Sequence, residues 1–148
     1  MTEFLFFLHI LLFTFSFAFT AGLGIFCDRV ASKGDAKTIH AVFGAALPLS
    51  TAGGIGWILT GLAGAALAGA TGMDMAAPWL LGAYAVLAVL LLSGFLLHLP
   101  WHRKVVAASA SPGPELDALL HAPIHRIAAG ISSVSILILI YLMTARPG

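Results

Sequence analysis

The stretch WLLGAYAVLAVLLLSGFLLH, residues 79–98, contains no lysine, arginine or acidic side chain. A helix needs about 20 consecutive apolar residues to cross the hydrocarbon core of a bilayer. The apolar run that contains this stretch extends from about Ala77 to Leu99, and three other runs also reach the length of a span. We therefore predict an all-α integral membrane protein, a four-helix bundle with helices at about residues 4–26, 40–70, 77–99 and 123–145.

The composition agrees with this class of protein. The chain has 148 residues, of which 60% are hydrophobic and 9% are charged, whereas about a quarter of the residues of a soluble domain are charged. The four spans fill almost the whole chain, so we predict a single transmembrane domain over residues 1–148. The net charge of +1 gives no indication of a nucleic-acid partner, and the single cysteine, Cys27, excludes an intrachain disulfide framework. Because the N-terminus lacks a basic segment, we expect the first run to be a retained helix and not a signal peptide.

The basic residues predict the orientation of the bundle. Six of the seven lysine and arginine residues lie after the first helix, after the third helix or at the start of the fourth: Arg29, Lys33, Lys37, Arg103, Lys104 and Arg126. Loops rich in these residues stay in the cytoplasm. We therefore expect both termini on the periplasmic or exterior side, and we expect a multi-pass protein of a bacterial inner membrane.

Small and polar residues mark the faces that should point into the bundle. In the first helix, His9, Ser16, Thr20 and Gly24 follow one another at spacings of seven, four and four, which places them on one face. The second helix carries a stripe of glycines that would let another backbone approach closely. We expect Pro48 to kink the second helix, and Pro100 to end the third, with His102 at or beyond that end. A short surface helix should begin at Pro114.

The histidines are the candidate functional residues. His40, His98 and His125 come from three helices and lie at similar depth, so a diagonal pair of His40 and His125 could ligate the iron of a haem b, and His98 could replace either. His9 lies about 20 Å or more from them along the membrane normal. The alternative is that His40, His102 and His121 are interfacial side chains and that His9 forms a packing hydrogen bond. No carboxylate lies within the predicted spans, which disfavours a proton-coupled transporter of the usual acidic kind.

Four stretches of the chain resemble a known family. FLHILLFTFSFAFTAGLGI is similar to the first helix of the HemJ-type protoporphyrinogen IX oxidases, ALPLSTAGGIGWILTGL to their second, residues 79–98 to their third, and HRIAAGISSVSILILIYLMTARP to their fourth. The resemblance implies a four-helix membrane protein that handles porphyrin or haem, with His9 as the matching functional histidine and Arg126 as the matching basic residue. The chain departs from the family near Gly82, where the family has a lysine, and at residues 129–132. It therefore also resembles related four-helix membrane families that lack the catalytic residues.

These observations favour one function and leave others open. The leading hypothesis is a small haem-b-binding membrane protein that acts in electron transfer or in haem or porphyrin handling, with His9, His40, His98, His125 and Arg126 as candidate cofactor-binding residues. The alternatives are a non-catalytic subunit of a larger membrane complex, a protoporphyrinogen IX oxidase, which would be a membrane oxidoreductase, and a metal carrier. The expected partners are the lipid bilayer and either a second copy of the chain or a larger complex.

Overall fold

The computed structural model describes residues 1–111 and 113–147, and within these residues it contains helices and no strand. Four helical segments, Thr2–Lys33, Ala36–Ala70, Pro78–Ser109 and Pro114–Ala145, are each long and apolar enough to cross a membrane. The elements in chain order are α1 (Thr2–Phe17), the π-helical turn η1 (Ala18–Gly22), α2 (Leu23–Lys33), α3 (Ala36–Ala70), α4 (Pro78–Ser93), the π-helical turn η2 (Gly94–His98), α5 (Leu99–Ser109), α6 (Pro114–Leu120) and α7 (Pro123–Ala145).

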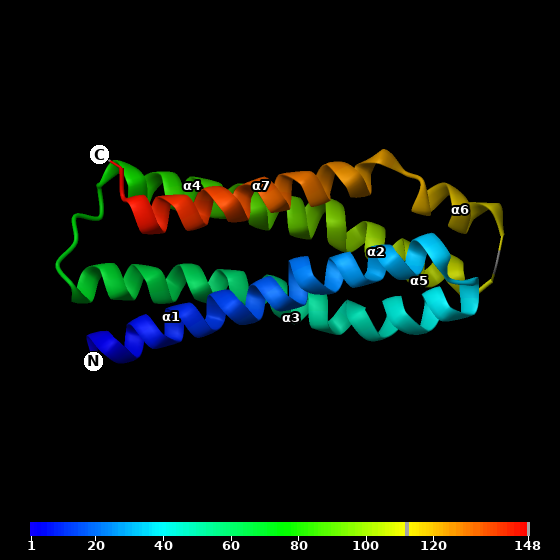
Figure 1. The fold of residues 1–148 in the computed structure, drawn as a ribbon, viewed down its shortest axis with the longest axis horizontal. Coiled ribbons are helices and arrows are strands. Elements are labelled where there is room, and N and C mark those ends of the chain that lie inside the picture. The colour runs from blue at the N-terminus through cyan, green and yellow to red at the C-terminus, as the bar shows by residue number, and fades with distance from the viewer. Residues whose placement is uncertain (112, 148) are drawn as a thin grey trace.

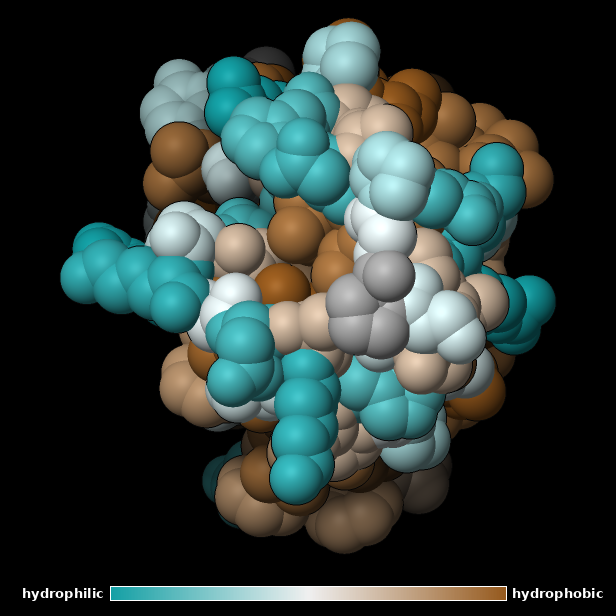
Figure 2. Space-filling model, turned by 90° about the vertical axis from the view of Figure 1, so that its right-hand side faces the viewer, coloured by the Kyte–Doolittle hydropathy of each residue, from teal (hydrophilic) through white to brown (hydrophobic). Residues whose placement is uncertain are grey.

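The helices form two antiparallel hairpins (Figure 1). In the first hairpin α1, η1 and α2 pack along α3, and in the second α4 packs along α7. The hairpins meet mainly where α3 packs against α5. Both termini lie at one end of the bundle, as the sequence predicts (Figure 1). We call the opposite end the basic end, because it carries the α2–α3 turn, α5, α6 and the start of α7, with Arg29, Lys33, Lys37, Arg103, Lys104 and Arg126 (Figure 2).

Local sequence signals explain where the helices begin. Asp35 caps α3, and the backbone N–H of Thr38 donates a hydrogen bond of 2.7 Å to its carboxylate, which holds the pKa of that carboxyl below its usual range. Pro78, Pro114 and Pro123 stand in the first turns of α4, α6 and α7, where a missing N–H costs nothing. The predicted short helix at Pro114 is therefore confirmed.

The first and third helical segments extend further than the sequence predicts. The first was expected to end near Phe26, but α2 continues to Lys33. The third was expected to end at Pro100, but α5 runs from Leu99 to Ser109 and contains His102, which is only 2% exposed. Pro100 does not end the helix because the π-helical turn η2 comes before it and it stands in the first turn of α5, where a proline is tolerated. The second helix continues through Pro48 and its glycine- and alanine-rich tail to Ala70.

The first hairpin depends on a close approach of α1 to α3. Ser16 is 0% exposed, and a Cβ added at Gly56 of α3 would overlap its Oγ. The His9 ring also lies close to Gly64, with 3.0 Å between its Cε1 and the position of an added Cβ. His9 and Ser16 of the predicted inward face of the first helix therefore pack on α3, whereas Gly54 and Gly61 of the predicted stripe of the second helix meet side chains of the second hairpin.

This interface gives a testable prediction. We expect Gly56→Ala to destabilise the protein by about 1–3 kcal/mol relative to Gly44→Ala, because a side chain forced into a packed contact costs roughly that much. Gly44 is the matched control, since it lies in the same helix and an added Cβ there meets nothing within 4 Å. The measurement is the thermal unfolding midpoint of both variants in lipid nanodiscs, and equal midpoints would contradict the described interface.

Candidate functional site

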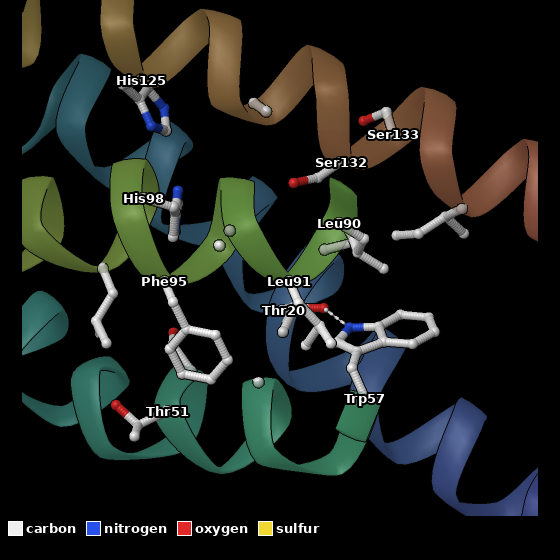
Figure 3. A pocket seen from close by; sticks show the side chains of 18 of the residues that line it. Thr20, Thr51, Trp57, Leu90, Leu91, Phe95, His98, His125, Ser132 and Ser133 are labelled. Atoms are coloured by element: carbon white, nitrogen blue, oxygen red, sulfur yellow. Dashed lines mark hydrogen bonds between the residues drawn. The ribbon is translucent and has the colours of Figure 1, made fainter. Parts of the chain in front are cut away.

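A cavity of about 150 Å³ lies between the two hairpins, and we call it the central cavity. All four helical segments line it, and most of its wall is apolar. Its lining includes Gly24, Gly54, Trp57, Leu90, Leu91, Phe95 and Ile136, together with the polar residues Thr20, Asp28, Ser50, Thr51, His98, His125, Ser132 and Ser133 (Figure 3). The glycines create part of this space, because they leave room between the helices where a side chain would stand.

Two polar residues of the cavity wall, Trp57 and Thr20, form a hydrogen bond with each other. The indole N–H of Trp57 donates to the Thr20 hydroxyl over 3.1 Å (Figure 3). The Thr20 hydroxyl in turn donates to the Ser16 carbonyl over 2.6 Å. Trp57 is nearly fully buried, so this chain of bonds fixes the floor of the cavity. These two residues are part of the structure and are not free to bind a ligand.

His98 is different, because no described residue forms a hydrogen bond with it. It ends η2, lines the cavity, and has the rings of Trp101, His102 and His125 as neighbours, with centroids 5.7, 6.0 and 5.7 Å away. Ser132 of α7 also turns its hydroxyl into the cavity without a hydrogen-bond partner among the described residues (Figure 3). The central cavity therefore presents an imidazole and a hydroxyl that can bind a molecule from outside the chain.

His125 is held in place from two sides. Its Nε2–H donates to Oδ1 of Asp28 over 2.7 Å, and its ring stacks on Trp101 with the centroids 3.9 Å apart and an interplanar angle of 14°. Trp101 is itself fixed, because its indole N–H donates to the Leu119 carbonyl over 2.9 Å. The Nδ1 atom of His125 is buried and has no hydrogen-bond partner among the described residues. Asp28 and His125 thus join α2 of the first hairpin to α7 of the second.

Asp28 is the functional candidate that the sequence analysis missed. It lies beyond the predicted end of the first span near Phe26, in the part of the first helical segment that continues to Lys33. The signal was present in the spacing, because Thr20, Gly24 and Asp28 are four residues apart and continue the predicted inward face by one turn.

The other histidines have partners within the chain. The Nδ1–H of His9 donates to the Thr60 carbonyl over 2.9 Å, which is the packing hydrogen bond considered as an alternative. His40 donates to the Val106 carbonyl and contacts the Ser109 hydroxyl, both at 3.1 Å, and does not pair with His125. His102 donates to the Phe43 carbonyl over 3.0 Å. The exposed His121 donates to the Asp117 carbonyl of its own helix over 2.9 Å.

Of the predicted candidates, the structure brings His98 and His125 together at the cavity, while Arg126 lies outside it, at the basic end.

The cavity does not fit a haem in the described conformation. The obstacle is space and not the lack of a ligand, because an axial ligand needs a free imidazole nitrogen and both His98 and the Nδ1 of His125 offer one. Sites for cofactors and drug-sized ligands measure about 300–1,000 Å³, and the central cavity of about 150 Å³ is smaller. Among the described residues, no group of three or more histidine, cysteine or acidic side chains could hold a metal ion.

Comparisons with family models, with curated proteins and with solved structures give no match to this chain. The resemblance to the HemJ-type oxidases therefore stays a hypothesis from the sequence, and the central cavity is the observation from which a function can be argued.

Proposed function

We propose that this chain is a multi-pass membrane protein that binds a small, largely apolar ligand in the central cavity, with His98 as the residue that recognises the polar group of the ligand. The observation that carries this proposal is the His98 imidazole, which lines the cavity and has no hydrogen-bond partner among the described residues. Polar side chains inside apolar helices are costly and are commonly functional. A ligand that accepts or donates a hydrogen bond would remove this cost.

The size and walls of the cavity limit the ligand. An apolar cavity of 150 Å³ in another protein takes up a molecule the size of benzene, and the central cavity has about this volume. Leu90, Leu91 and Phe95 would contact the apolar body of the ligand, and the Ser132 hydroxyl is a second polar group within reach of the cavity. These features favour a single ring or a short apolar chain with one or two hydrogen-bonding groups.

The ligand proposal gives a prediction. We expect a small molecule to co-purify with the protein in lipid nanodiscs, and we expect His98→Leu to lower its occupancy about tenfold or more, because a lost buried hydrogen bond costs about 1–3 kcal/mol and each 1.4 kcal/mol is tenfold in affinity. His40→Leu is the matched control, since His40 bonds to α5 and does not line the cavity. Mass spectrometry of the extracted molecules gives the occupancy.

The same preparation also tests the alternatives. Equal occupancy in the two variants, or an empty parent protein, would contradict the role of His98. An absorption spectrum with a Soret band that His98→Leu removes would instead support the haem b hypothesis from the sequence and would require the hairpins to separate around the macrocycle. A protein that purifies only within a larger assembly, and without a small molecule, would support the subunit hypothesis.

We further propose that the basic end faces the cytoplasm of a bacterial cell and that the exposed apolar side chains face lipid. Phe4, Leu96 and Leu137 are among the large apolar side chains that are more than 60% exposed, and they come from three different helices. Exposing so much apolar surface to water would cost free energy, whereas the lipid chains of a bilayer would cover it. The basic residues at one end set the direction of insertion.

The orientation can be measured with reporter fusions. We expect alkaline phosphatase fused to the C-terminus to be active and green fluorescent protein fused there to be dark, because the former requires export and the latter folds in the cytoplasm. Fluorescent cells that lack phosphatase activity would place the termini in the cytoplasm and would reverse the proposed orientation.

A further inference from the structure

A second hollow, of about 680 Å³, opens at the basic end, and we call it the basic-end hollow. Ser32, Trp101, Asp117, His121 and Arg126 contribute to its wall. Figure 2 shows this end face-on, with charged and polar side chains around apolar ones. Asp28 and His125 line both the basic-end hollow and the central cavity. The hydrogen-bonded pair therefore stands at the boundary between the two spaces.

The hydrogen bond between Asp28 and His125 can break without disturbing other hydrogen bonds of the two side chains. One hydrogen bond of 2.7 Å joins the pair, and Nδ1 of His125 has no other partner among the described residues, so breaking this single bond releases the imidazole from the first hairpin. The Asp28 side chain is 47% exposed, which gives it an alternative partner in water, whereas the His125 side chain is only 11% exposed. Trp101 is buried and bonded to Leu119, so it stays as a fixed wall behind the imidazole.

We propose that the Asp28–His125 pair is the gate of the central cavity, and that a ligand enters from the basic-end hollow when the two side chains separate. The identity of the ligand rests on the proposed function, but the role of the pair as a gate does not. The gate lies between the two hairpins, so a small movement of α7 away from α2 is sufficient to break it. The access path would then run from the side of the membrane that the basic end faces, past Asp28 and His125, to His98.

Cysteine labelling tests the gate without any knowledge of the ligand. Cys27 is the only cysteine, so Cys27→Ala provides a background without thiols. Ser132→Cys then reports on the central cavity, and Ser32→Cys reports on the basic-end hollow. The probe is a membrane-impermeant, positively charged methanethiosulfonate, added to the full-length protein in vesicles of known orientation. Ser32→Cys shows which face of the membrane the basic end occupies.

With the gate intact, we expect slow labelling of Ser132→Cys from either face. Asp28→Ala should accelerate it at least tenfold, and only from the face at which Ser32→Cys reacts. Asp28→Asn should stay slow, because the amide oxygen keeps the shape and accepts the same hydrogen bond. Asp117→Ala is the matched control, since Asp117 lines the hollow but not the cavity, and it should leave the rate unchanged.

His125→Leu breaks the same pair from α7 and gives a second, independent test if Asp28→Ala fails to fold, which the loss of its thermal unfolding transition would reveal. Unchanged labelling of Ser132→Cys in folded Asp28→Ala and His125→Leu proteins, or acceleration from the opposite face, would overturn the gate. Accelerated labelling in a protein that binds no ligand would leave the gate in place and reject the proposed function, so the two failures are distinguishable.

Discussion

A polar side chain on a membrane-length helix must find its hydrogen-bond partner inside the protein, because the lipid tails offer none. Four polar side chains of the described residues meet this requirement. His9 bonds to the backbone of α3, Trp57 bonds to Thr20, His102 bonds to the Phe43 carbonyl, and His125 bonds to Asp28. Each of these bonds joins two different helical segments, so the polar residues act as connections between helices. His98 is the histidine for which the described residues provide no hydrogen bond at all, and it lies at the cavity.

The shape of the bundle follows from where the helices can approach one another. Glycines of α3 accept the side chains of α1 on one face, and Gly54 and Gly61 of the same helix accept Phe95 and Leu87 of the second hairpin on another. The first hairpin is therefore tightly closed, and the second packs against it mainly through α3 and α5. The central cavity remains between the hairpins, and at its boundary with the basic-end hollow the two are joined by the side chains of Asp28 and His125.

The sequence was sufficient for some of these features and insufficient for others. Hydropathy located four membrane-length helices, and the spacing of Ser16, Thr20 and Gly24 identified the inward face of the first. Hydropathy marks where the apolar run ends and not where the helix ends, so the polar continuations to Lys33 and Ser109 were missed. Asp28 and His102 were missed with them. The choice between His40 and His98 as the neighbour of His125 depends on which faces of the helices pack together, and a single sequence does not contain that information.

The central claim is that His98 binds a molecule that is not part of the chain. The most direct measurement is the nuclear magnetic resonance spectrum of the His98 ring nitrogens, labelled with nitrogen-15, in protein that retains its native lipids. Our account predicts contacts between this ring and a bound small molecule, and a ring-nitrogen shift that changes when the molecule is removed. A His98 nitrogen that bonds to a group of the protein itself, with only lipid chains or water in the central cavity, would contradict the account.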